Sequence, residues 1–170
     1  MVEFDLPEFP PADHPVEGER APDFTRPLVD GEYWENRPFS EVAAEAGAAL
    51  LVFYPLNWGG KSKFWWEEIQ KRGWGGDDLE VLGIGISQPF DHQRFIESHA
   101  LEYSLYSDPG NGVARRYDIV HDLDGMAGIE EPRPAAFLVD DELTVEYVWV
   151  ADVWPETPPY DDVEAALDRV

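Results

Sequence analysis

The chain has 170 residues, with 12 basic and 36 acidic side chains, a net charge of −24 and no cysteine. This length suits a single domain with its own core, and 44% hydrophobic residues are too many for a disordered chain. Without cysteine, disulfides, thiolate metal sites, iron–sulfur clusters and thiol-based reactions of the chain's own side chains are excluded.

The acidic charge indicates in which solvent conditions the protein works and which partners it can bind. Only three of the 12 basic residues are Lys, and Asp and Glu are spread along the whole chain. Such a surface suits a protein that stays folded in concentrated salt, where carboxylate repulsion is screened. We expect a protein from the cytoplasm of an extreme halophile; the alternative is an ordinary acidic protein with a basic partner. Neither nucleic acid nor a membrane is an expected partner, and no signal peptide or bilayer-spanning apolar run is readable.

The N-terminal segment differs from the rest in composition. Residues 1–20 are rich in Pro and in acidic side chains and show no sustained periodicity. They predict an extended N-terminal arm, either draped over the protein or disordered. Residues 21–170 then form the single expected domain.

The first part of that domain alternates strands and helices. Residues 48–54 are a continuous apolar run, typical of a parallel strand covered on both faces, and a Gly-rich turn leads from it into a helix over 61–72. Residues 79–86 predict a second buried strand, and Pro89 opens the following helix.

The second part ends in a hairpin. A short strand over 104–106 and a helix over 112–117 come first. Residues 134–139 and 144–150 flank a turn and predict an antiparallel hairpin, and 163–170 carry the apolar stripe of a closing helix. Together the elements predict an α/β fold, with a central mixed sheet of about five strands flanked by helices.

The Gly-rich turn is the most informative stretch for function. One interpretation is a nucleotide-binding P-loop, because Gly60-Lys61-Ser62 matches the end of that motif and Asp140 ends an apolar strand as a magnesium-binding carboxylate would. The first Gly of the motif is replaced by Pro55, which offers no N–H to a phosphate. Phosphate or nucleotide binding at Gly60-Lys61-Ser62 is therefore an alternative function.

A second interpretation uses the whole chain. Five fragments occur in a fixed order: Ala21-Pro22-Asp23-Phe24, Phe53-Tyr54-Pro55, Val81 to Ser87, Leu105 to Gly110 and Pro134 to Asp141. In this order they resemble the peroxiredoxin family, in particular its bacterioferritin-comigratory branch, which is similar to the alkyl hydroperoxide reductase and thiol-specific antioxidant proteins. The resemblance covers about residues 20–168 and implies a thioredoxin fold, in agreement with the element order.

The resemblance also implies a site. The family motif is Pro, three residues, Thr, two residues, Cys; counted from Pro55, the Thr position is Gly59 and the Cys position is Ser62. Arg133 is the candidate for the family's active-site Arg, although it stands one residue early. These four residues make up the predicted vestigial pocket. In a family-like pocket, Ser62→Cys would give a thiol of lowered pKa.

The replacement of Cys by Ser62 changes the expected function. A serine hydroxyl cannot reach thiolate-like acidity or follow the sulfenic acid cycle. We predict a peroxiredoxin-like protein without thiol peroxidase activity that acts by binding or as a regulatory partner. The alternative is an antioxidant oxidoreductase that reduces peroxide by a non-cysteine route or with a partner's thiol. A homodimer or a cysteine-containing redox partner is expected, and no cofactor or metal.

Three local expectations complete the sequence reading. Ser62 is expected to cap the helix that follows it, with a catalytic Ser–Lys pair through Lys61 or Lys63 as the alternative. His92 and His99 are expected to be surface or core residues, because no carboxylate spacing completes a metal site. Residues 121–125 predict an exposed acidic loop.

Overall fold

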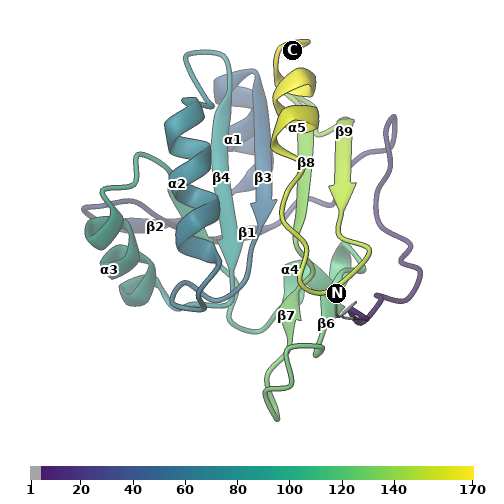
Figure 1. The fold of residues 1–170 in the computed structure, drawn as a ribbon. Coiled ribbons are helices and arrows are strands. Elements are labelled where there is room, and N and C mark those ends of the chain that lie inside the picture. Colours follow the sequence, from purple (N-terminus) through teal and green to yellow (C-terminus); the bar gives the residue numbers. More distant parts are fainter. Residues whose placement is uncertain (1–4) are drawn as a thin grey trace.

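The computed structural model describes residues 5–170 and contains a seven-stranded sheet and a separate two-stranded one (Figure 1). The strands are β1 (Thr25–Val29), β2 (Trp34–Pro38), β3 (Ala48–Phe53), β4 (Glu80–Gly85), β5 (Ser104–Ser107), β6 (Val120–His121), β7 (Glu131–Pro132), β8 (Ala135–Asp140) and β9 (Val145–Val150). The helices are α1 (Phe39–Ala46), α2 (Ser62–Arg72), α3 (Pro89–His99), α4 (Gly112–Arg116) and α5 (Tyr160–Leu167). None of these helices has the length and apolar character needed to cross a membrane.

The large sheet is mixed, as expected, but it has more strands than the five expected. Its order is β2-β1-β5-β4-β3-β8-β9. Strands β3, β4 and β5 are parallel, whereas β8, β9, β1 and β2 each run antiparallel to the neighbours they pair with. The predicted hairpin is the pair β8–β9, and the closing helix α5 begins earlier and ends sooner than its apolar stripe indicated.

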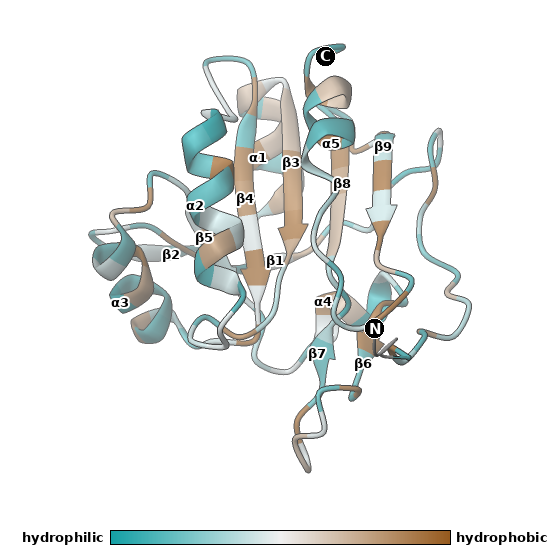
Figure 2. Ribbon diagram, viewed as in Figure 1, coloured by the Kyte–Doolittle hydropathy of each residue, from teal (hydrophilic) through white to brown (hydrophobic). Residues whose placement is uncertain are grey.

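The core explains the continuous apolar strands. All six residues of β3 are buried, because helices cover the sheet on both faces. One cluster of buried side chains joins α1 and α4 to the sheet, and the other joins α2, α3 and α5 to the opposite face. Figure 2 shows the result: most of β3 at the centre is brown, whereas α2, to the left of β4, is largely teal. The sheet is therefore the middle of three layers.

Strands β1 and β2 and helix α1 were not predicted. The two strands contain Pro27 and Pro38 and are mostly half-exposed, so neither shows an apolar run or a clean alternation. Helix α1 is separated from β3 only by Gly47, which ends the helix at φ 97°. The apolar residues of helix and strand thus merge into one run, and the Gly47 stop signal was the feature that could have separated them.

The described part of the N-terminal arm lies along the C-terminal hairpin. The backbone N–H of Phe9 donates to the Asp152 carbonyl over 2.9 Å, and that of Trp154 donates to the Pro7 carbonyl over 2.8 Å. Nearer the domain, Val145 N–H donates to Glu19 over 2.8 Å. Residues 5–20 are therefore draped over the edge of the sheet beside β9.

Candidate functional site

The Gly-rich turn connects the end of β3 to the start of α2. The carboxyl ends of β3 and β4 point to the same edge of the sheet, where the β6–β7 pair also lies (Figure 1). The turn is fixed from within, because the Tyr54 hydroxyl donates to Asn57 Oδ1 over 2.7 Å. It is also fixed from outside, since Asn57 Nδ2 donates to Asp91 Oδ2 at the start of α3 over 2.9 Å.

His92 completes this network behind the turn. Its side chain is fully buried, and Nε2 lies 3.0 Å from the Tyr106 carbonyl oxygen, which can only accept. The ring is therefore protonated at Nε2, and Nδ1 accepts from Asn57 Nδ2 over 3.1 Å. Burial lowers the pKa of His92 to about 4. His92 is thus one of the core histidines that the sequence allowed, and it holds the turn as a neutral ring.

Ser62 lies at the first position of α2 and is fully buried. Its hydroxyl lies 3.0 Å from the Pro55 carbonyl oxygen and 2.7 Å from that of Leu56, and it donates to this pair. The prediction that Ser62 caps the helix is wrong: Lys61 occupies the cap position, and the hydroxyl points back at the carbonyls of the turn.

The lysines beside Ser62 do not activate it. Among residues 5–170 no hydrogen bond joins Ser62 to Lys61 or Lys63. Lys63 instead pairs with Glu67 one turn along the helix, with Nζ 3.7 Å from the carboxylate. The Ser–Lys interpretation is therefore not supported by the geometry, because a general base must reach the proton that it removes.

Arg133 binds the N-terminal arm. Its guanidinium donates to the Ala151 carbonyl from Nη2 over 2.6 Å and to the Pro10 carbonyl from Nη1 over 2.9 Å, and it lies 4.4 Å above the ring of Phe9. Within the described part of the chain, none of its hydrogen bonds reaches Ser62. Its contacts fasten the arm to the end of β9.

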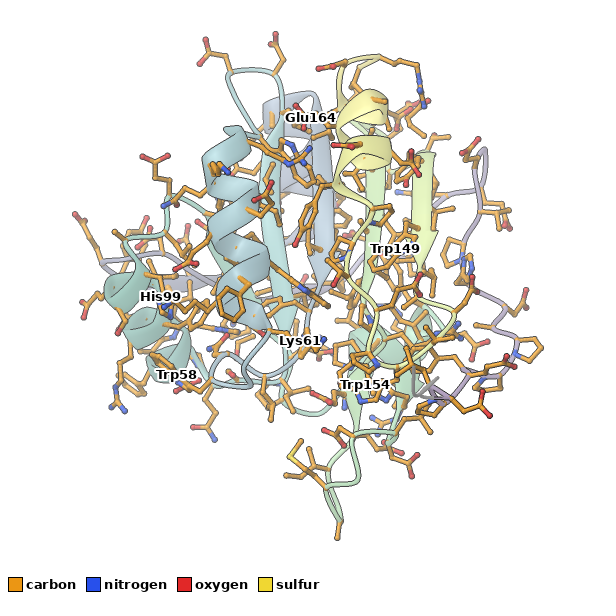
Figure 3. The ribbon with its side chains drawn as sticks, in the orientation of Figure 1. Trp58, Lys61, His99, Trp149, Trp154 and Glu164 are labelled. Carbon is orange, nitrogen blue, oxygen red and sulfur yellow. The ribbon has the colours of Figure 1, made fainter. Side chains whose placement is uncertain are left out.

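A pocket of about 370 Å³ opens beside the turn. Its apolar wall consists of Pro55, Leu56, Met126 and Trp154, and the turn contributes Gly59, Gly60 and Lys61. Figure 3 shows Lys61 and Trp154 in the lower half of the view. Of the four residues of the predicted vestigial pocket, Pro55 and Gly59 line this cavity, whereas Ser62 and Arg133 are not among its lining residues.

Two carboxyl groups, Asp124 and Glu131, also line the pocket, and sequence reasoning missed both. Glu131 is only 2% exposed, and its pKa rises to about 8 because of burial first and the hydrogen bond and charge of Asp124 second. Asp124 Oδ1 accepts from the Met126 N–H over 3.2 Å, while Oδ2 is buried and has no donor among the described residues. Near neutral pH the Glu131 carboxyl is therefore largely protonated, beside the Asp124 carboxyl group.

The expectation of an exposed loop over residues 121–125 is wrong in part. His121 is 7% exposed because it pairs with Glu131 across the β6–β7 ladder and packs 4.7 Å from the ring of Trp154. Asp124 is partly buried by the same arrangement. Each strand of this ladder has two residues, so no periodicity in the sequence could have indicated it.

The strand register also overturns part of the P-loop interpretation. Asp140 pairs with Ala48, the first residue of β3, because β8 runs antiparallel to β3. The Gly-rich turn follows Phe53 at the opposite end of that strand. Asp140 instead accepts from the backbone N–H groups of Glu142 and Thr144 in the hairpin turn. It cannot supply the magnesium-binding carboxylate of a P-loop.

The three-layer arrangement, with a turn from β3 into α2 and a β8–β9 hairpin closed by α5, defines a thioredoxin-fold protein. The family model described as AhpC/TSA matches residues 17–148, and the chain belongs to this family. The resemblance and the fold expected from the sequence are thus confirmed.

Relatives and solved structures agree. The chain is 29% identical over 143 residues to a putative peroxiredoxin bcp of Coxiella burnetii, covering 78% of this chain and 86% of that protein. It is 27% identical over 146 residues to the chloroplastic peroxiredoxin Q of Arabidopsis thaliana, covering 82% of this chain and 61% of that protein. A peroxiredoxin-like protein from Aquifex aeolicus shares the fold with a TM-score of 0.76 and 20% identity, covering 96% of this chain and 91% of that one. The peroxidoxin BcpB of Mycobacterium tuberculosis also shares the fold, with a TM-score of 0.68 and 21% identity, covering 91% of this chain and 97% of that one.

Proposed function

We propose that this protein is a peroxiredoxin-family member that has lost thiol peroxidase chemistry and acts by binding a ligand or partner at the pocket beside Ser62. The environment of Ser62 carries the proposal. Its hydroxyl is buried and directed at two carbonyl oxygens, neither of which can accept its proton as a base. A hydroxyl in that position has neither the access nor the activation that a nucleophile requires.

The surroundings also disfavour negative charge at this position. The carbonyl oxygens of Pro55 and Leu56 present their negative ends to Ser62, and the carboxyl pair lies in the pocket beside the same turn. The guanidinium of Arg133, which would favour an anion, donates instead to the Pro10 carbonyl of the N-terminal arm and to the Ala151 carbonyl after β9. The same reasoning argues against phosphate binding at Gly60-Lys61-Ser62, because the two carboxyls would repel the phosphate.

Peroxide reduction by a non-cysteine route or with a partner's thiol is the competing function. It would require peroxide to reach the turn, and the accessible cavity there is the pocket of about 370 Å³. A regulatory role would use the same surface toward another protein, either a second copy of this chain or a cysteine-containing redox protein. We further propose a salt-rich cytoplasm as the setting, because the chain carries 36 acidic and 12 basic side chains.

The test is a peroxide-consumption assay with a thiol reductant, run in parallel on this protein, its Ser62→Cys variant and a cysteine-containing relative. We expect consumption by the relative only. Ser62→Cys should give a thiol with a pKa above the usual value of about 8.5, because burial and the facing carbonyl oxygens disfavour the thiolate. This is the reverse of the shift that the family resemblance implies. After peroxide treatment of Ser62→Cys, a dimedone-type reagent should therefore trap no sulfenic acid.

Two outcomes would overturn the proposal. Peroxide consumption by the unmodified protein above that of the reductant alone would establish a non-cysteine route. Rapid consumption by Ser62→Cys would mean that the site is still built for peroxide and lacks only the sulfur atom.

A further inference from the structure

We propose that the pocket beside the Gly-rich turn binds a small primary amine with an apolar body, with its ammonium group held by the Asp124 and Glu131 carboxyls. The inference rests on the proposed function, since it names the class of ligand that the same pocket takes.

The first argument is a shortage of hydrogen-bond donors. As carboxylates, Asp124 and Glu131 only accept hydrogen bonds, and Asp124 Oδ2 is buried with no donor among the described residues. Glu131 has the Leu56 backbone N–H nearby, which favours its charged form, but burial and Asp124 outweigh that effect. The pair therefore needs one further donor: a proton supplies it in the empty pocket, and an ammonium group would supply up to three N–H donors in its place.

The second argument is the shape and lining of the cavity. Its volume of about 370 Å³ lies within the range of small-molecule sites, and Pro55, Leu56, Met126 and Trp154 give it an apolar wall. Such a wall takes the body of the ligand, and an indole ring is the side chain that best accommodates a neighbouring cation. The carboxyls and the apolar wall line one cavity, so a ligand with both features can use them together.

Charge complementarity selects an amine over other ligands. An anion would face the charge of the carboxyl pair, and a neutral alcohol would leave that charge without a counterion. Lys61 also lines the pocket, but its ammonium lies within 4 Å of no carboxylate in the described part of the chain, so it does not neutralise the pair. A divalent cation would require more ligands, and residues 5–170 contain no group of three side chains that could hold one.

Proton release follows from the geometry. The groups around Glu131 are Asp124 from the loop between β6 and β7, the Leu56 backbone N–H of the turn and His121 from the paired strand, and Lys61 lines the same pocket. His121 has a pKa lowered mainly by burial, so it stays neutral near pH 7, and the proton of the carboxyl pair is the one that an ammonium displaces. Binding should therefore release a proton near neutral pH, and amine affinity should rise with pH until the carboxyl pair is fully ionised.

The experiment is titration calorimetry on the full chain with 2-phenylethylamine as the probe, in two buffers of different ionisation enthalpy. The matched probes are 2-phenylethanol, 3-phenylpropanoate and calcium chloride. We expect binding of the amine alone, with proton release. Glu131→Gln should weaken binding by at least about tenfold, because a charged hydrogen-bond partner is lost. Glu130→Gln is the matched control, since that neighbouring carboxylate is exposed and pairs with Arg115 over 2.7 Å.

The outcomes separate the inference from the function on which it rests. The amine proposal would be overturned if 2-phenylethanol bound as well as the amine, or if 3-phenylpropanoate or calcium bound better. An unchanged amine affinity in Glu131→Gln would also overturn it. No binding of any probe by a peroxide-inert protein would overturn it too, while leaving the loss of peroxidase chemistry intact. Circular dichroism confirms that each variant is folded; if Glu131→Gln is not, Asp124→Asn repeats the test on the other carboxyl.

Discussion

Neutral His92 holds the turn between β3 and α2, which ends at Ser62. The ring connects Asn57 in the turn to the Tyr106 carbonyl at the carboxyl end of β5, and the contact with Asn57 depends on an unprotonated Nδ1. Protonation would place an N–H opposite the Asn57 amide, which is itself a donor. The position of the turn is therefore tied to the protonation state of one buried ring.

This leads to a prediction on pH-dependent stability. The pKa of His92 is about 4 in the fold and about 6.5 when unfolded, so the unfolded chain takes up the proton first and stability falls as pH drops through that window. At pH 5 the loss is about 2 kcal/mol relative to neutral pH. Glu131, whose pKa rises to about 8, acts in the opposite sense and costs stability as pH rises.

Urea unfolding of the protein and of His92→Gln at pH 7 and pH 5 isolates this effect, because every other titrating group is common to both. The variant should be less stable at pH 7. The difference in the free energy of unfolding between the parent protein and the variant should then be smaller by about 2 kcal/mol at pH 5. His99→Gln, at the half-buried end of the same helix, is the control. A gap that stays constant with pH would mean that His92 does not remain neutral in the fold.

At the scale of elements, α2 lies closely against the sheet at Gly83. A Cβ atom built on Gly83 would lie 2.5 Å from Cζ2 of Trp66 in α2 and 2.6 Å from Cδ2 of Leu105 in β5. Both side chains are buried, so neither can move aside freely. The absence of a side chain at this one position of β4 lets the helix that begins at Ser62 pack where it does.

We therefore expect Gly83→Ala to destabilise the protein by about 1–3 kcal/mol, the cost of overpacking a core. The control is Gly76→Ala, because a Cβ atom at Gly76 has no neighbour within 4 Å. That variant should stay within about 0.5 kcal/mol of the parent. Chemical denaturation of both variants provides the measurement, and equal stabilities would contradict this account of the packing.

The sequence predicted elements where patterning is strong. Strand β3 is six buried apolar residues, and α3 opens with a proline, so both could be recognised from the chain alone. Strands β1 and β2 are short and contain prolines, and their place in the sheet depends on pairing with each other and with β5. Long-range pairing of this kind leaves no local periodicity.

The site was predictable only in part for the same reason. Pro55 and Gly59 could be placed by counting along one loop, because their position depends on local chain order. Glu131 reaches the pocket through a two-residue ladder, and Arg133 turns to the arm because Pro10 is draped beside it. Such contacts between distant segments are absent from any local motif.

At the scale of the whole molecule, the acidic surface leads to a prediction about salt. The chain has 36 acidic side chains, nearly all of them outside the core, and an accessible surface of 8748 Å², which places neighbouring carboxylates on the order of 15 Å apart. In dilute buffer the Debye length is about 30 Å, so each carboxylate repels many others, whereas at molar salt it shrinks to about 3 Å. Repulsion that opposes the folded state should therefore disappear as salt is added.

We expect the Tm of this protein to climb steeply between dilute buffer and molar KCl, followed by differential scanning calorimetry. Salt also affects apolar groups in every protein, so a peroxiredoxin of small net charge is measured in parallel, and only the excess rise is assigned to the screening of carboxylates. The rise should be steepest where the Debye length falls below the spacing of the carboxylates, that is between about 0.01 and 0.1 M. A flat or falling curve, or a rise equal to that of the control, would contradict adaptation of this surface to concentrated salt.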